Sequence, residues 1–332
     1  MYVLELAGQD EDAFAVYEAE QAASDVRLVA PGLARARGIT DRVRDLAFTH
    51  RASELIGRAE GESGTSVTVA DARAVLEAAS IEREGTVAVR AVDVRGTTGI
   101  DTQRVERELG QVLVDRGFAV DLDDPDHELR ALFSRDDDGE GVCLLGWLAV
   151  ETPREFTQRA PTDRPFFQPG SMDPMLARAL ANVAGAREGA TVLDPMCGTG
   201  GILIEAGLVG ADVLGVDVQR KMGRGTRENL ADALDGGWGV VRGDATSLPV
   251  ADGGVDAAVF DAPYGRQSKI EGELNALVEG ALTEARRVAP RCVVVGDRPW
   301  ARPASAAGWT VEASFERRVH RSLTRYVLVL RR

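Results

Sequence analysis

Four apolar runs in the second half of the chain each lead into an aspartate. The runs "TVLD", "VLGVDV", "VVRGDA" and "VDAAVFD" place Asp194, Asp217, Asp244 and Asp261 at strand ends. Helical periods separate the runs, and such alternation is typical of a parallel sheet with helices on both faces. Since the carboxyl ends of parallel strands share one edge, where open α/β sheets bind ligands, we predict that the four acids share a site.

The flanking segments predict further elements. "WTVEASFERRV" and "SLTRYVLVLRR" have no helical segment between them, which indicates an antiparallel hairpin at one edge of the sheet. The first third is typical of a smaller α+β region, with strands in "MYVLELAG", "GTVAVRAVDV" and "EGVCLLGWLAVE". "DTQRVERELGQVLVDRG" predicts a helix with Asp101 as its N-cap and Gly117 just past its end.

Five prolines and no sustained period mark the stretch from residue 152 to residue 174 as a linker. We expect an N-terminal region over residues 1–58, a second region over 59–151, a linker over 152–170 and the parallel-sheet domain over 171–332.

The formal net charge of −14 argues by itself against a nucleic-acid partner. Lys221 and Lys269 are the only lysines, and the other cations are arginines. We interpret this acidic, lysine-poor composition as adaptation to high salt; binding to basic proteins is the alternative. The C-terminal "FERRVHRSLTRYVLVLRR" holds six arginines against one acid, and such a local patch matters more for phosphate contact than the total charge.

The three cysteines, Cys143, Cys197 and Cys292, are scattered and indicate neither a disulfide framework nor a zinc site, so no metal is expected. The sequence shows no apolar run long enough to cross a bilayer and no signal-peptide pattern, so we expect a cytoplasmic protein.

The stretch "VLDPMCGTGGILIEA" predicts a strand, a glycine turn and a helix. Gly198 and Gly200 let the backbone turn tightly and approach a ligand. The third glycine of a dinucleotide-binding turn is missing, and the acid at the strand end favours a cation or amine over a phosphate. Asp217 suits a ribose diol and Asp244 an adenine amino group, although each acid taken alone is also compatible with a solvated turn.

From residue 165 to 332 these motifs resemble the S-adenosylmethionine-dependent methyltransferases of the Rossmann-like class. The resemblance implies that the first glycine turn lines the methionine end of the cofactor, and that "FFQPGS" upstream also contacts it. The cofactor-binding residues that it implies are Phe167, Gly170, Asp194, Pro195, Cys197, Gly198, Thr199, Gly200, Asp217, Val218, Asp244 and Ala245.

The stretch "DAPY" resembles the (D/N/S)-P-P-(Y/F) motif of methyltransferases that act on planar amino groups. Hydrogen bonds from the amine to the Asp261 carboxylate and the Ala262 carbonyl would direct its lone pair at the methyl group. Tyr264 would stack on the base and Pro263 would stiffen the turn. Ala262 departs from the family's proline, which implies a less rigid turn. The alternative is an ordinary strand ending in an Asp-x-Pro turn.

The motif alone is compatible with methylation of the amino group of adenine, cytosine or guanine, or of the side-chain amide of glutamine. "VDLDDPDHELR" and its surroundings resemble a THUMP domain, an RNA-binding module. With "DPMCGTGGILIEA", "DAPYGRQS" and "RRVHRSLTRYV", the chain resembles the archaeal tRNA (guanine-10-N2)-methyltransferase family. This implies a Rossmann-like α/β sheet behind an N-terminal ferredoxin-like/THUMP α+β region, and mono- then dimethylation of guanosine 10. The alternatives are a guanine-N2 methyltransferase for another tRNA position or for rRNA, and a non-catalytic RNA-binding protein, which the intact acids argue against.

The resemblance also implies partners. We expect tRNA as substrate, with a small activator subunit as a further candidate because some related enzymes need one, and neither membrane nor DNA. Trp300 and Trp309 are interpreted as packing residues. The predicted substrate-contacting residues are Arg266, Ser268, Arg318, His320, Arg321 and Arg325.

Overall fold

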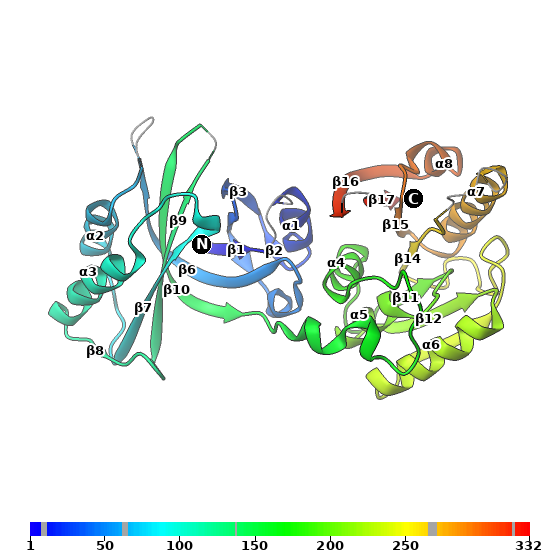
Figure 1. Cartoon of the computed structure of the whole chain (residues 1–332), viewed down its shortest axis with the longest axis horizontal. Coiled ribbons are helices and arrows are strands. Elements are labelled where there is room, and N and C mark those ends of the chain that lie inside the picture. Colours follow the sequence, from blue (N-terminus) through cyan, green and yellow to red (C-terminus); the bar gives the residue numbers. More distant parts are fainter. Residues whose placement is uncertain (8–11, 62–65, 137, 265–270, 321–322) are drawn as a thin grey trace. The chain divides into compact units, whose positions relative to one another are not determined.

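The computed structural model describes residues 1–7, 12–61, 66–136, 138–264, 271–320 and 323–332, without the side chains of Glu271, Val319 and His320. The chain divides into two compact units, Met1–Pro153 and Arg154–Arg332. Figure 1 labels most of the helices and strands of each unit.

The first unit is built on a mixed eight-stranded sheet with the order β3-β4-β1-β6-β10-β9-β7-β8. Its strands are β1 (Tyr2–Leu6), β3 (Arg27–Ala30), β4 (Leu33–Ala36), β6 (Thr49–Glu60), β7 (Thr86–Asp93), β8 (Ala119–Val120), β9 (His127–Arg135) and β10 (Gly141–Glu151), and a separate pair joins β2 (Ala23–Ser24) to β5 (Gly38–Ile39). The expected boundary between residues 58 and 59 falls inside β6, which pairs with β1 on one side and β10 on the other.

Helices α2 (Val69–Ala78) and α3 (Thr102–Asp115) pack against this sheet and against each other, while α1 (Asp12–Ala19) packs near β1 and β3. The predicted cap of α3 is confirmed, because the Asp101 carboxylate accepts the Arg104 N–H at 3.0 Å. Gly117, just past the helix end, has a φ of 99°, which a residue with a side chain rarely adopts. The sequence patterns did not reveal α2 or the strands between residues 23 and 60.

The second unit contains a seven-stranded sheet with the order β13-β12-β11-β14-β15-β17-β16. Its elements are α4 (Pro174–Ala184), β11 (Thr191–Asp194), α5 (Gly201–Leu208), β12 (Asp212–Asp217), α6 (Arg220–Ala233), β13 (Trp238–Arg242), β14 (Ala257–Asp261), α7 (Glu271–Val288), β15 (Arg291–Gly296), α8 (Ala301–Ala306), β16 (Thr310–His320) and β17 (Leu323–Arg331). The first five strands pair in parallel, and β17 runs antiparallel to both neighbours. Both the parallel sheet and the C-terminal hairpin are therefore confirmed (Figure 1).

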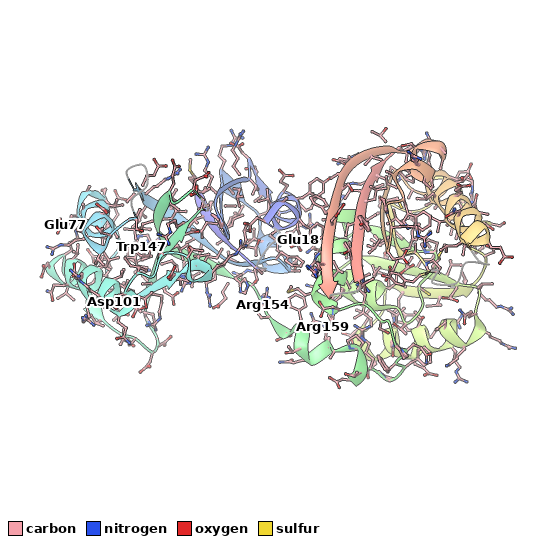
Figure 2. All side chains as sticks on the ribbon, turned by 45° about the horizontal axis from the view of Figure 1, so that its top comes forward. Glu18, Glu77, Asp101, Trp147, Arg154 and Arg159 are labelled. Atoms are coloured by element: carbon pink, nitrogen blue, oxygen red, sulfur yellow. The ribbon has the colours of Figure 1, made fainter. Side chains whose placement is uncertain are left out.

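The proline-rich stretch before α4 includes the short 3-10 helices η3 (Glu155–Arg159) and η4 (Pro161–Asp163), and it is held onto the second unit by a buried ionic cluster. Glu205 on α5 is fully buried and pairs with Arg159 at 2.9 Å and with Arg178 of α4 at 2.9 Å. Arg159 is labelled in Figure 2. Because removing one partner of a buried ion pair is costly, this cluster fixes the segment that approaches the glycine turn.

Candidate active site

The glycine turn follows β11 and opens α5. Asp194 ends the strand, and its Oδ1 accepts the Met196 N–H at 2.9 Å. Gly198 and Gly200 have φ values of 53° and 80°, in the left-handed region that favours glycine. A Cβ on Gly200 would lie 2.7 Å from Cγ2 of Thr226, whereas one on Gly198 would meet only the Met196 carbonyl oxygen, 3.9 Å away. Gly200 therefore allows close packing, and Gly198 faces open space.

Asp217 at the end of β12 holds this turn in place. Its Oδ2 accepts the Gly198 N–H at 3.0 Å, and its Oδ1 accepts the Gln219 N–H at 2.7 Å. The next residue, Val218, is 60% exposed. Its predicted contact with the cofactor stays a prediction.

Asp244 lies two residues beyond the end of β13, in a turn of its own. Its Oδ1 accepts both the N–H and the hydroxyl of Thr246 at 2.8 Å, and these bonds lower the pKa of Asp244 below its ordinary value. Asp244 is exposed, and the adjacent Ala245 is buried.

A cavity of about 180 Å³ connects the glycine turn to the end of β14. It confirms the predicted proximity of Asp194, Gly198 and Asp261, and the segment before α4 closes one side. The lining residues are Gln168, Pro169, Gly170, Ser171, Met172, Asp194, Met196, Cys197, Gly198, Thr199, Gly201, Ile202, Met222 and Asp261.

Seven of the residues predicted to bind the cofactor lie outside this lining: Phe167, Pro195, Gly200, Asp217, Val218, Asp244 and Ala245. Sequence reasoning missed the methionines of the cavity wall, among them Met196 and Met222, because an apolar residue near a turn carries no distinctive pattern. Gln168 and Ser171 belong to the upstream segment "FFQPGS", from which only Phe167 and Gly170 were predicted to bind the cofactor.

Two acids, Asp194 and Asp261, line the cavity. Burial above all, together with the nearby Asp217 and Asp261, raises the pKa of Asp194 to about 8. A cationic ligand would favour the ionised forms of Asp194 and Asp261, the two acids that line the cavity, in line with the prediction from the strand-end acids.

The residues after β14 form the second half of the site. The Tyr264 hydroxyl donates to both carboxylate oxygens of Asp261, at 2.9 and 3.2 Å. The hydroxyl thus occupies the carboxylate that is predicted to accept the substrate amine, and stacking of the Tyr264 ring on the base stays a prediction. Burial raises the pKa of Asp261 to about 6 against the opposing effects of Arg325 and of this hydroxyl.

Ala262 explains how the chain tolerates its departure from the proline motif. Its N–H donates to the Val295 carbonyl of β15 at 2.8 Å, extending the ladder between β14 and β15 by one bond. A proline at this position could not donate this hydrogen bond. In Ala262 the backbone hydrogen bond therefore restrains the turn in place of the proline ring. The methyl group is buried in the core under α7.

Of the residues predicted to contact the substrate, one is buried, one is exposed, and the side chains of the other four lie outside the described residues. Arg325 is buried, with Nη2 3.6 Å from Oδ2 of Asp261, whereas Arg318 is exposed on β16. His320 ends β16, and its side chain lies outside the described residues, as do Arg266, Ser268 and Arg321 altogether.

Trp300 and Trp309 are both 3% exposed, and the Trp309 indole donates to the Leu282 carbonyl at 2.8 Å. The packing role predicted for them is confirmed.

Comparisons with known proteins agree with this geometry. The family model of the RMKL-like methyltransferase domain matches residues 161–326. The tRNA (guanine(10)-N2)-dimethyltransferase of Methanothermobacter thermautotrophicus is 35% identical over 294 residues, covering 86% of this chain and 83% of that protein. The chain belongs to the archaeal tRNA (guanine(10)-N2)-dimethyltransferase family. A second member, from Pyrococcus abyssi, is 30% identical over 74% of each chain.

The fold of this dimethyltransferase family member also matches a solved structure. TrmN from Thermus thermophilus aligns over 100% of this chain and 99% of its own with a TM-score of 0.51 at 23% identity. That likeness supports the fold class, with an α+β sheet in the N-terminal unit and a Rossmann-like sheet in the C-terminal unit. No helix in the described part of the chain is long and apolar enough to span a membrane.

S-adenosylmethionine is the cofactor of this family, and the site fits it. Gly170 and Gly198 line the cavity and have φ values of 89° and 53°. Because neither residue has a Cβ, the space beside each of them is open to a ligand. The acids favour the positive sulfonium and ammonium groups. The cavity is smaller than pockets that enclose whole ligands of this size, so it fits part of the cofactor.

Replacing Asp217 by alanine is expected to weaken S-adenosylmethionine binding about tenfold to a hundredfold, because hydrogen bonds to a charged group are each worth roughly 1.5–3 kcal/mol. The Gly198 turn also loses its anchor, which acts in the same direction. Titration calorimetry measures the affinity. Asp232→Ala, an exposed acid on α6, is the matched control. Unchanged affinity of Asp217→Ala would place the ribose elsewhere.

Proposed function

We propose that this protein transfers methyl groups from S-adenosylmethionine to N2 of guanosine 10 in tRNA, giving N2-methylguanosine and then N2,N2-dimethylguanosine. The observation that carries the proposal is one cavity joining the Gly198 turn to Asp261, in a chain that shares 35% identity with a tRNA (guanine(10)-N2)-dimethyltransferase.

When bound, S-adenosylmethionine supplies an electrophilic methyl group on sulfur. The chain's own contribution is to orient the amine. The lone pair of guanine N2 is delocalised into the ring, so the nitrogen is a poor nucleophile until hydrogen bonds from its N–H groups draw it toward tetrahedral geometry. The Asp261 carboxylate and the Ala262 carbonyl are the acceptors for those bonds, and most of the rate gain is positioning.

The reaction breaks the methyl carbon–sulfur bond, forms the carbon–nitrogen bond and releases one proton from nitrogen. Asp261 holds that N–H and is placed to receive the proton. After the first transfer the nitrogen keeps one hydrogen, so the same carboxylate can orient it for the second. Both rounds therefore use one acceptor, provided that the pocket accommodates the first methyl group.

Tyr264 must exchange partners for this to happen, because its hydroxyl now donates to Asp261. Tyr264→Ala is expected to slow single-turnover methyl transfer roughly tenfold to a hundredfold, since stacking on a base is worth about 1–3 kcal/mol. Tyr264→Phe keeps the ring, removes the competing hydroxyl and should stay within about threefold of the natural protein. Equal losses in both variants would show that the hydroxyl, and not the ring, carries the role.

The first unit is proposed to bind tRNA, with residues 59–151 as its THUMP-like part and residues 1–58 as its N-terminal part. The exposed Arg318 on β16 is proposed to contact RNA beside the target base, with Arg266, Ser268, His320 and Arg321. The net charge of −14 leaves little general attraction to RNA, so shape recognition and stacking are assigned more of the affinity. A small activator subunit stays part of the proposal as a candidate partner.

The proposal is tested on unmodified tRNA incubated with the protein and deuterium-labelled S-adenosylmethionine. Nucleoside mass spectrometry should show labelled N2-methyl- and N2,N2-dimethylguanosine, and fragment mapping should place them at position 10. Label at another position, or in rRNA alone, would favour the alternative guanine-N2 target. Absence of label with the activator subunit also present would refute the activity.

A further inference from the structure

Arg325 reaches the active site through the C-terminal hairpin. It lies near the start of β17, which runs antiparallel to β15 with Tyr326 opposite Gly296. The beginning of β17 therefore lies at the edge where the parallel strands end. Asp261 pairs with Val295 of β15 at that same edge.

Arg325 is a buried cation that contacts Asp261 and also interacts with Tyr264. Its side chain is 7% exposed, and Nη2 lies 3.6 Å from Oδ2 of Asp261. Its Nε is buried without a hydrogen-bond partner in the described part of the chain. A side chain this enclosed presents no charge to an RNA phosphate at the surface, in contrast to the exposed Arg318.

We propose that Arg325 is a positioning residue that acts through Asp261, keeping its carboxylate ionised and oriented to accept the N–H of the substrate amine. This inference rests on the proposed function. It replaces the sequence-based role of Arg325 as a direct contact to tRNA.

The need for such a cation follows from the charges around Asp261. Burial favours the protonated form of Asp261, and the like charge of Asp297 after β15 acts in the same direction. Arg325 from β17 and the Tyr264 hydroxyl favour the ionised form. When Tyr264 turns to the base, Arg325 is the described side chain that still favours the ionised form of Asp261. A protonated carboxyl loses one acceptor and cannot take up the released proton.

The sign of the pH dependence follows. Methyl transfer requires ionised Asp261, so the rate falls as pH drops through the Asp261 pKa, which is about 6. Without the cation this pKa rises, and the acid limb of the pH profile moves to higher pH. Arg325→Gln should lose about tenfold in single-turnover rate near pH 6.5 and recover to within about twofold above pH 8.5, corresponding to a rise of roughly 1.5 pH units.

The test measures single-turnover rates at saturating cofactor and tRNA from pH 5.5 to 9 for the natural protein, Arg325→Gln and Arg325→Lys. The lysine keeps the charge and should restore most of the acid limb. Arg331→Gln, on the same strand and paired at the surface with Glu312, is the control and should leave the limb in place. A loss in Arg325→Gln that is equal at all pH values would overturn the inference, as would a change confined to the KM for tRNA.

Carbon-13 NMR of the Asp261 carboxyl gives a readout that needs no turnover. The midpoint should lie near pH 6 in the natural protein and rise in Arg325→Gln. A midpoint above pH 7.5 in the natural protein contradicts the inference even if Arg325→Gln does not fold. Because this titration is independent of RNA, a protein that fails to methylate guanine refutes the proposed function while the link between Arg325 and Asp261 is still decided.

Discussion

Asp261→Ala should lower methyl transfer to tRNA by roughly a hundredfold to a thousandfold while leaving the affinity for S-adenosylmethionine within about threefold. The loss is large because the carboxylate is the principal acceptor for the substrate amine, and removing one preorganised hydrogen-bonding group at a reacting centre typically costs about 3–4 kcal/mol. The affinity changes little because the anchoring contacts of the glycine turn come from Asp217.

Single-turnover rates with tRNA and calorimetry with the cofactor measure the two effects separately. Asp256→Ala is the matched control. Asp256 precedes β14 at the opposite end of the strand and accepts the Thr191 N–H at 2.8 Å. Its loss should affect stability and not the chemical step. Near-natural turnover in Asp261→Ala would mean that another group orients the amine, and the assignment of the catalytic centre would be wrong.

The strand-end acids were the part of the site that sequence alone could predict. Asp194 and Asp261 share a cavity because parallel strands in one sheet bring their carboxyl ends to the same edge, and this needs only the order of strand and helix signals. Asp244 shows the limit of that reasoning, since β13 ends two residues earlier and the carboxylate bonds within its own turn.

The contacts of Arg325 and Tyr264 could not be predicted in the same way. The position of Arg325 depends on the register of β17 against β15, which a basic composition does not reveal. The bond from Tyr264 to Asp261 depends on side-chain rotation, which the motif leaves open. Glu205 likewise looks unremarkable in "GILIEA", yet it is fully buried between two arginines.

The acidic composition bears on how tRNA is bound. Adaptation to high salt stays a prediction from composition, as does a cytoplasmic location. If the prediction holds, counterion release would contribute little to tRNA affinity under native conditions. Recognition would then depend on a separate RNA-binding unit, whose contribution can be measured by removing it.

A chain that begins at Arg154 should bind S-adenosylmethionine with natural affinity and lose at least about a thousandfold in kcat/KM for tRNA. The second compact unit starts at this residue and contains the whole cavity together with the Arg159–Glu205–Arg178 cluster that holds its upstream wall. The loss reflects remote binding energy, which positions the substrate at the reacting centre and is unavailable to the isolated unit.

Calorimetry and mapped nucleoside mass spectrometry test both halves of this expectation. Residues 1–153 added as a separate chain should restore little activity, because covalent linkage supplies an effective concentration that mixing does not. The full chain carrying Asp261→Ala serves as the inactive reference. Efficient labelling of the natural tRNA position by the shortened chain would show that the methyltransferase unit selects its own target. The N-terminal unit would then need another role.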